Sequence, residues 1–188
     1  IEVLKGKSVF KYDLNNNLVG FTHYDFNGVA QWSTETKYDS NNNKIEYYDT
    51  SGKQIWKYDL NNNLIELSSY NHEGSFESKQ VYKYDPNNNV IEVSNYDSNL
   101  KLKEGTVNAQ TFYKYDSNNN KIEEHVYTSN KICQYEINYV YDSNNNLIKG
   151  TRYNLAGELN HYWISEYDLN NNLIKESFYK KDGSFNFK

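Results

Sequence analysis

One short motif, Tyr-Asp-x-Asn-Asn-Asn, occurs seven times in the 188 residues and constrains the fold more than any other feature of the sequence. Its copies begin at Tyr12, Tyr38, Tyr58, Tyr84, Tyr115, Tyr141 and Tyr167. A shorter relative of the motif follows each copy and begins at Tyr24, Tyr48, Tyr70, Tyr96, Tyr127, Tyr153 and Tyr179. We call the first kind NNN turns and the second kind companion turns. Such internal repetition is typical of a repeat protein, in which each repeat packs on its neighbours.

Both motifs have the composition of a tight hairpin turn. Counting the tyrosine as the first residue, the fifth is usually Asn or Gly, which best tolerate a left-handed backbone. An aspartate at the second position accepts hydrogen bonds from amides two residues further on. We therefore predict hairpin turns at all fourteen copies. The structural turn residues are Asp13 and, at fifth positions, Asn16, Gly28, Asn42, Gly52, Asn62, Gly74, Asn88, Asn119, Asn145, Gly157, Asn171 and Gly183.

The steps between successive turn tyrosines are even. They are 12, 14, 10, 10, 12, 14 and 12 residues from Tyr12 to Tyr96, and 12, 14, 12, 14 and 12 from Tyr115 to Tyr179. Side chains alternate between faces along a strand, so even steps should keep all turn tyrosines on one face. The exception is the step of 19 residues from Tyr96 to Tyr115, which we assign to an inserted loop at about 99–109.

Alternate residues before an NNN turn are aromatic or branched, and those between them are polar. Before Tyr141, for example, come Tyr139, Ile137, Tyr135 and Cys133. Lys and Glu recur at the other positions, as is typical of an antiparallel sheet with one face in water. We predict an all-β fold, a single-layer antiparallel β-meander of about 14–15 short strands that forms a curved or spiralling strip. The whole chain, 1–188, is expected to be one repeat domain.

Composition supports an aromatic interior and excludes some partners. Twenty Tyr, three Trp and eight Phe supply large rigid rings. The net charge of -5 argues against nucleic acid as a partner. No apolar run is long enough to span a membrane. The chain has no methionine, so we expect translation to begin upstream of Ile1. The single cysteine, Cys133, has the parity of the aromatic residues and is expected to be a small buried apolar group.

No pattern of a catalytic or metal site is present. Asp13, Asn15 and Asn17 imitate the first half of a calcium loop, but Leu18 stands where that loop needs glycine. The four histidines, His23, His72, His125 and His161, do not have the spacing of zinc ligands. The glutamates recur with each repeat and do not form a distinctive pair. We expect no enzyme activity, no metal and no cofactor.

The Tyr-Asp-x-x-Gly pattern, clearest at 24–28 and 48–52, resembles the YD repeat of the Rhs and teneurin proteins from about Tyr12 to Gly183. The resemblance, to a divergent Asn-rich bacterial form, implies a β-hairpin strip that spirals into a shell, which in larger members encloses a toxin or other cargo. This sequence departs from the pattern by placing Asn at the NNN turns and by a usual double step of 26 residues. A weaker likeness is to the MORN-like repeats of some bacterial antitoxins.

The aromatic face is the candidate binding surface. Its candidate residues are Trp32, Trp56, Tyr82, Tyr135, Tyr139, His161 and Trp163. Such rings stack on sugars or anchor a protein partner, and they also form the core of a curved sheet. Our leading hypothesis is a non-catalytic scaffold or binding module of a secreted or bacterial cell-surface or periplasmic assembly, with another protein as partner. The alternatives are a glycan-binding strip and a cytoplasmic immunity or antitoxin-like protein.

Overall fold

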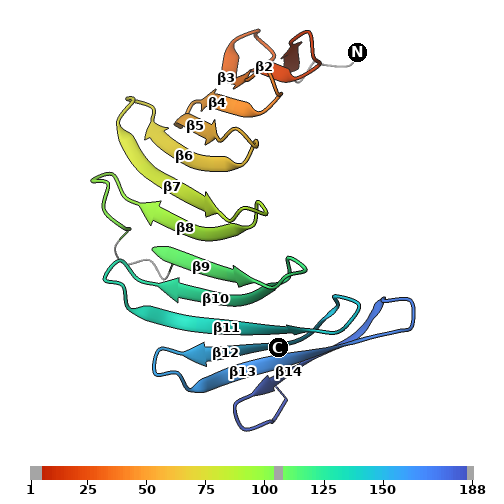
Figure 1. Ribbon diagram of the computed structural model, residues 1–188. Coiled ribbons are helices and arrows are strands. Elements are labelled where there is room, and N and C mark those ends of the chain that lie inside the picture. Colours follow the sequence, from red (N-terminus) through yellow and green to blue (C-terminus); the bar gives the residue numbers. More distant parts are fainter. Residues whose placement is uncertain (1–5, 104–107, 186–188) are drawn as a thin grey trace. The chain divides into compact units, whose positions relative to one another are not determined.

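The computed structural model describes residues 6–103 and 108–185, and within them every regular element is a β-strand (Figure 1). Fourteen strands form one open antiparallel sheet and follow chain order from β1 to β14. This arrangement confirms the predicted all-β meander. Contacts divide the chain into two compact units, with the division inside β7. Unit 1 holds Ile1–Val81 and Asp97–Leu100, and unit 2 holds Tyr82–Tyr96 and Lys101–Lys188.

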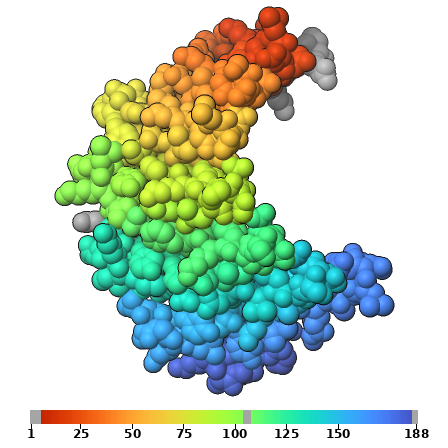
Figure 2. Space-filling view, viewed as in Figure 1, coloured from red at the N-terminus to blue at the C-terminus, as the bar shows by residue number. Residues whose placement is uncertain are grey.

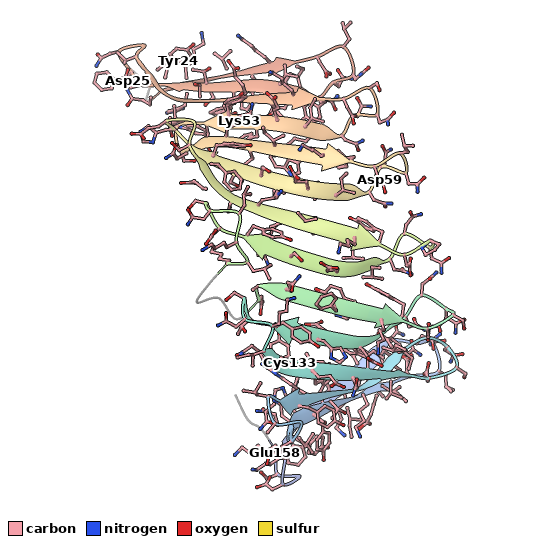
Figure 3. The ribbon with its side chains drawn as sticks, turned by 60° about the vertical axis from the view of Figure 1, so that its left-hand side comes forward. Tyr24, Asp25, Lys53, Asp59, Cys133 and Glu158 are labelled. Atoms are coloured by element: carbon pink, nitrogen blue, oxygen red, sulfur yellow. The ribbon has the colours of Figure 1, made fainter. Side chains whose placement is uncertain are left out.

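Unit 1 contains the first seven strands, except for the last residues of β7. They are β1 (Lys7–Tyr12), β2 (Leu18–Tyr24), β3 (Ala30–Tyr38), β4 (Lys44–Asp49), β5 (Gly52–Tyr58), β6 (Leu64–Asn71) and β7 (Phe76–Tyr84). Hairpins join successive strands, so NNN turns lie at one end of the strands and companion turns at the other. Figure 3 shows this for Asp25, in a companion turn, and Asp59, in an NNN turn.

Unit 2 contains the remaining strands. They are β8 (Val90–Tyr96), β9 (Gln110–Tyr115), β10 (Lys121–Tyr127), β11 (Cys133–Tyr141), β12 (Leu147–Asn154), β13 (Leu159–Tyr167) and β14 (Leu173–Lys180). Within this unit Figure 2 shows the sequence colours as successive bands, because each strand contacts the next one in the chain.

The inserted loop expected at about 99–109 lies in part outside the described residues, since 104–107 are not described. Of the part that is described, Leu102 forms an isolated β-bridge with Tyr96. Ala109 is fully buried.

The NNN turns are three-residue hairpin loops closed by backbone hydrogen bonds. The Asn16 N–H donates to the Asp13 carbonyl at 3.2 Å, and the Asp13 N–H donates to the Asn17 carbonyl at 3.0 Å. Asn16 has a φ of 63°, the left-handed residue that such a loop needs before its bulge. The Asp13 carboxylate accepts the N–H groups of Asn15 and Asn17 at 2.8 and 2.9 Å, which holds the loop in this conformation.

Positive φ values occur at the fifth residue of both kinds of turn. Among the residues singled out in the sequence they are Asn16, Asn42, Asn62, Asn88, Asn119, Asn145, Asn171, Gly28, Gly52, Gly74, Gly157 and Gly183. Two companion turns adopt the same conformation with residues that disfavour it, Leu100 at 59° and Lys131 at 60°. The hairpin repeat therefore imposes this backbone on the residue rather than the reverse.

Asparagine side chains link successive NNN turns within each unit. In unit 1 the Nδ2 groups of Asn15 and Asn17 donate to the Oδ1 of Asn42, at 3.2 and 2.9 Å. The same bonds run from Asn41 and Asn43 to Asn62, and in unit 2 from Asn118 and Asn120 to Asn145 and from Asn144 and Asn146 to Asn171. We call this series the asparagine ladder. In each ladder bond the acceptor is the side chain of the asparagine with positive φ. Glycine would suit the backbone at this position, but it has no side chain that could accept the bond.

The tyrosine of an NNN turn binds the residue that follows the preceding NNN turn. The Tyr141 hydroxyl donates to the Lys121 carbonyl at 3.0 Å, and the Tyr58 hydroxyl to the Lys44 carbonyl at 3.0 Å. The same contact joins Tyr38 to Leu18, Tyr115 to Val90 and Tyr167 to Leu147. The first tyrosine of an NNN turn therefore connects two repeats by a hydrogen bond and is also part of a turn.

A bulge at the NNN turns, at Tyr12 for example, places the two sets of turn tyrosines on opposite faces. Lys11 is paired with Gly20, and the pairing shifts by one residue between Lys11 and Tyr12. Paired residues share a face and neighbours along a strand alternate, so Tyr24 lies on the face of Lys11 and Tyr12 on the other. The expectation of one face for all turn tyrosines is wrong, because even spacing does not reveal the extra residue of a bulge.

The sheet therefore has two chemically distinct faces. The aromatic face carries the NNN-turn tyrosines. The charged face carries the companion-turn tyrosines together with Lys37 and Glu46, which are paired across β3 and β4, and the equivalent residues of other hairpins.

Cys133 lies on the charged face, contrary to its expected place among the aromatic residues. Val126 is paired with Tyr135, but the pairing then shifts and Tyr127 is paired with Cys133. The thiol of Cys133, which is labelled in Figure 3, is half-buried and lines a cavity together with Glu136. Burial, with the nearby Glu136 charge, raises the pKa of the Cys133 thiol. The thiol therefore stays protonated near neutral pH and is a poor nucleophile.

Few of the described side chains are fully enclosed. The buried ones are Ala109, Val126, Ser68, Ser94, Thr111, Ser165 and Ser177. Most other strand residues are half-buried, because a single-layer sheet covers a side chain only with its neighbours on the same face. Stability must therefore come mainly from contacts between adjacent strands.

Candidate functional site

The charged face consists of lysine–glutamate pairs across adjacent strands. Lys37 Nζ lies 2.8 Å from the Glu46 carboxylate, and Lys57 Nζ lies 2.8 Å from that of Glu66. Equivalent pairs are Lys83–Glu92, Lys114–Glu123 and, with the signs reversed, Lys175–Glu166. The lysines are largely exposed, so each pair contributes about 0–1 kcal/mol. Their repetition favours strand register and does not resemble a catalytic pair of carboxylates.

An open aromatic patch lies on β1–β3 of unit 1. Phe10 meets the edge of Phe21 with ring centroids 4.9 Å apart, and Phe21 lies against Trp32 at 4.4 Å. His23 is 6.1 Å from Trp32. Trp32 is 47% exposed, and Phe10 is 52% exposed. Of the sequence-predicted binding residues in unit 1, Trp32 is therefore the one whose ring is open to a partner.

A lysine covers two further aromatic rings of unit 1. Lys44 Nζ lies over the Tyr47 ring at 4.7 Å and over the Trp56 ring at 4.3 Å. A cation held over a ring face is attracted by the negative potential of the π-system. Lys44 therefore occupies the positions that a sugar or a ligand cation would need on these rings.

In unit 2 a lysine also lies over two aromatic rings, and here it is more enclosed by its neighbours. Lys121 Nζ lies over the rings of Tyr113 and Tyr139, at 5.2 and 4.7 Å, and binds the Glu124 carboxylate at 2.7 Å. The Tyr139 hydroxyl donates to the same carboxylate at 3.2 Å. Burial disfavours the charged lysine, but the hydrogen bond and charge of Glu124 and the contact with Tyr139 outweigh burial and raise the pKa of Lys121. The ammonium group is therefore fixed and charged.

Arginine and glycine complete the aromatic face of unit 2. The Arg152 guanidinium lies 3.9 Å from the centre of the Tyr135 ring. Trp163 packs against Tyr139 at 6.1 Å and over Gly150, where a Cβ atom would overlap the indole. Glycine at this position thus makes room for the tryptophan.

His161 lies 6.5 Å from Trp163. Burial and the positive charge of Arg152 lower the pKa of His161, so its imidazole is neutral near pH 7.

The structure brings some predicted binding residues together and separates others. Tyr139, Trp163 and His161 are neighbours, whereas Trp56 lies under Lys44. Burial raises the pKa of the tyrosine hydroxyls at Tyr82, Tyr135 and Tyr139. These half-buried rings, several under cations, have the character of an interior surface.

Sequence reasoning missed the two lysines that cover the rings. Both stand directly after an NNN turn, in the sequence YDSNNNK, where the other turns have Leu or Val. A lysine at an otherwise apolar position was the available signal.

A notch interrupts the companion-turn end of unit 1. The turn from Tyr48 to Gly52 lies between the two 10-residue steps, so its hairpin is shorter than its neighbours. A cavity of about 520 Å³ results, lined by Tyr48, Lys53, Tyr70 and His72 among others (Lys53 is labelled in Figure 3). A Cβ atom at Gly52 would overlap the Tyr70 carbonyl, so glycine is required for the close approach of these strands.

The described residues contain no group of three His, Cys, Asp or Glu side chains placed to hold a metal ion. They also contain no helix of the length and apolarity that crossing a bilayer requires.

Comparison with known proteins gives a likeness in fold only. No model of a protein family and no curated protein matches the chain. Among solved structures, TcdB2-TccC3 without its hypervariable C-terminal region has a TM-score of 0.61 at 16% identity over 90% of this chain. TcdB2-TccC3-TEV has a TM-score of 0.58 at 17% identity over 92%. The Photorhabdus luminescens Tc holotoxin pore has a TM-score of 0.52 at 14% identity over 90%. This chain spans 10–12% of those chains.

Proposed function

We propose that this chain is a non-catalytic section of a YD-repeat β-strip that serves as a scaffold, through protein–protein contacts, in a secreted bacterial assembly. The observation that carries the proposal is the fold likeness of this β-meander to TcdB2-TccC3 over 90% of the chain. One of these neighbours is a Tc holotoxin pore, and the matched section is a small part of each neighbour's much longer chain.

The surface chemistry supports a scaffold rather than a catalyst. The turn aspartates are occupied by amides of their own turns, and the glutamates of the charged face by lysines. Lys44, Lys121 and Arg152 lie over five rings of the aromatic face, those of Tyr47, Trp56, Tyr113, Tyr135 and Tyr139. What the chain offers a partner is a set of exposed strand edges and the open patch around Trp32.

Affinity purification from the native bacterium tests the proposal. A tag inserted in the exposed companion turn at Ala156 leaves the NNN-turn end free, and a second tagged chain with the insertion at Leu100 controls for the choice of turn. Both should recover the chain from the secreted or surface fraction, as a stoichiometric component of a larger complex. Recovery from the cytosol with a toxin as the sole partner would replace the scaffold with the antitoxin alternative.

Glycan-array binding separates the carbohydrate alternative. The scaffold proposal expects no sugar signal that depends on Trp32, in wild type or in Trp32→Ala. A specific sugar signal that Trp32→Ala removes and that Trp56→Ala, under Lys44, leaves intact would establish the open patch as a glycan site.

A further inference from the structure

Arg152 is the only arginine of the chain and lies, half-buried, on the aromatic face of unit 2. The carbon of its guanidinium is 3.9 Å from the centre of the Tyr135 ring. At this van der Waals distance the group lies flat on the ring, and its N–H donors point outward in their own plane. Within residues 6–103 and 108–185 the guanidinium forms no ion pair and donates no hydrogen bond. The ring therefore holds a rigid fork of donors that lacks an acceptor.

The carboxylates around Arg152 are engaged by other groups. Glu124, two strands away in the same cross-strand row, binds the Lys121 ammonium at 2.7 Å. Glu158, in the turn between β12 and β13, accepts a hydrogen bond from the Asn154 side chain at 3.1 Å. Neither carboxylate pairs with the arginine, so its charge is left for another acceptor.

His161 is paired with Arg152 across β12 and β13. Directly paired residues have Cβ atoms about 4.5–5.5 Å apart, so both side chains can reach one ligand. The Nδ1 of His161 lies 2.7 Å from the Asn160 Oδ1. Because that oxygen can only accept, Nδ1 carries the proton and Nε2 is the open nitrogen. The Nε2 atom accepts in the neutral imidazole and becomes a second donor once it is protonated.

Positive charge surrounds His161. In the part of the chain that the structure describes, the charged residues paired with it are Arg152 on β12 and Lys180 on β14. Burial and the charge of Arg152 lower the pKa of His161. An anion bound to Arg152 would offset this repulsion and bring negative charge to the imidazole. A ligand and a proton should therefore bind together, each increasing the affinity of the site for the other.

Aromatic rings adjoin this pair of side chains. The Trp163 ring lies 6.5 Å from that of His161, and Trp163 is paired with Phe178, which is 43% exposed. Such rings can contact an apolar body that is joined to an anionic group. A ligand that suits both parts of the site has two acceptor oxygens next to an apolar or aromatic group.

We propose that Arg152 and His161, with the adjoining rings of Trp163 and Phe178, bind a carboxylate attached to an apolar or aromatic group. The two carboxylate oxygens accept N–H groups of the guanidinium, as in bidentate arginine–carboxylate pairs. The protonated His161 donates from Nε2 to the same carboxylate. A carboxylate suits this half-buried site better than a phosphate, because it has a single charge to remove from water. The inference does not depend on the proposed scaffold function.

Titration of the full chain with sodium benzoate, followed by NMR of the histidine side chains, tests the proposal. The other three histidines, His23, His72 and His125, are internal controls. Benzoate should shift the His161 signals, raise the pKa of His161 and bind about threefold or more tightly at pH 6 than at pH 8. Benzamide has the ring without the charge, and acetate has the charge without the ring. Each should bind about threefold or more weakly than benzoate.

Substitutions separate the contributions of the two side chains. Arg152→Gln should weaken benzoate binding about tenfold or more. Arg152→Lys keeps a cation but loses the planar fork, so its affinity should lie between those of wild type and Arg152→Gln. His161→Gln, followed through the indole signal of Trp163, should remove the difference between pH 6 and pH 8. Lys149→Gln is the matched control and should bind like wild type, because Lys149 lies over a tyrosine ring on the charged face of the same strand.

The acetylated tripeptide amide Phe-Glu-Phe distinguishes a carboxylate of a protein from that of a free acid. Binding of either probe that depends on Arg152 supports the site, and the tighter probe identifies the source of the carboxylate. Unchanged His161 signals at up to about 50 mM of both probes would overturn the proposal. So would full binding to a folded Arg152→Gln chain, or inorganic phosphate that binds more tightly than benzoate.

Discussion

Replacing Asn42 by glycine should destabilise unit 1, although glycine suits the backbone at this position better. Asn42 has a φ of 64° and accepts two ladder bonds, at 3.2 Å from Asn15 and 2.9 Å from Asn17. A hydrogen bond contributes about 0.5–1.5 kcal/mol net, and exposure to water places these two in the lower part of that range. We therefore expect a loss of about 1–2 kcal/mol in the free energy of unfolding.

Asn16→Gly is the control, because Asn16 has almost the same φ, 63°, and accepts no ladder bond among the described residues. Glycine changes the backbone freedom of the folded and unfolded chains alike at the two positions. The difference between the two variants therefore isolates the ladder. Asn16→Gly should leave stability unchanged or raise it slightly.

Urea unfolding followed by tryptophan fluorescence measures this difference, since Trp32 and Trp56 both lie in unit 1. Hydrogen exchange of the amides at 39–49 gives a local readout that does not assume two-state unfolding of the whole repeat array. Both are done at a concentration at which the chain is monomeric. Equal effects of Asn42→Gly and Asn16→Gly would show that the ladder bonds add nothing to stability.

Four further outcomes are expected. Tyr141→Phe, which removes the bond to the Lys121 carbonyl, should cost about 1 kcal/mol in urea unfolding. Lys131→Gly should raise the thermal midpoint, because it relieves a left-handed non-glycine residue that costs about 1–2 kcal/mol. Gly150→Ala should lower that midpoint by overlap with Trp163, at a cost of about 1–3 kcal/mol. Hydrogen bonds from the third asparagine of each NNN turn lower the pKa of the turn aspartate in the folded chain. The resulting stabilisation is complete above the aspartate pKa of the unfolded chain, about 3.9, and is lost as the pH falls through the lower pKa of the folded chain. Acid titration followed by circular dichroism checks this loss.

The sequence was informative about turns because turn chemistry is local. An aspartate followed by amides, and an Asn or Gly at the fifth position, specify a hairpin from within five residues. The positions of Asn16 and Gly28 could therefore be read without knowledge of their neighbours. Even the fold class followed, since closely spaced hairpins leave room only for short antiparallel strands.

The faces were only partly predictable. Alternation along one strand is a local rule, and it placed Tyr139 and Trp163 on a common face correctly. It failed at Cys133 and at the companion-turn tyrosines, because a bulge inserts an unpaired residue whose position depends on the partner strand.

The contacts between side chains on the aromatic face could not be predicted from the sequence. A lysine after an NNN turn could be seen, but that Lys121 covers Tyr113 and Tyr139 while it binds Glu124 depends on side chains from several strands. Those groups meet only when the strands are in register. The same holds for the notch at Gly52, which needs longer hairpins on both sides.

The sequence by itself determined where the chain reverses and that it forms a meander, because those choices are made by residues in contact along the backbone. Only the tertiary structure decided which ring lies under which cation, and why Asn rather than Gly occupies the NNN turns. The acceptor of Asn42 is used by Asn15 and Asn17 of another turn. The benefit of that asparagine exists only when two repeats lie side by side.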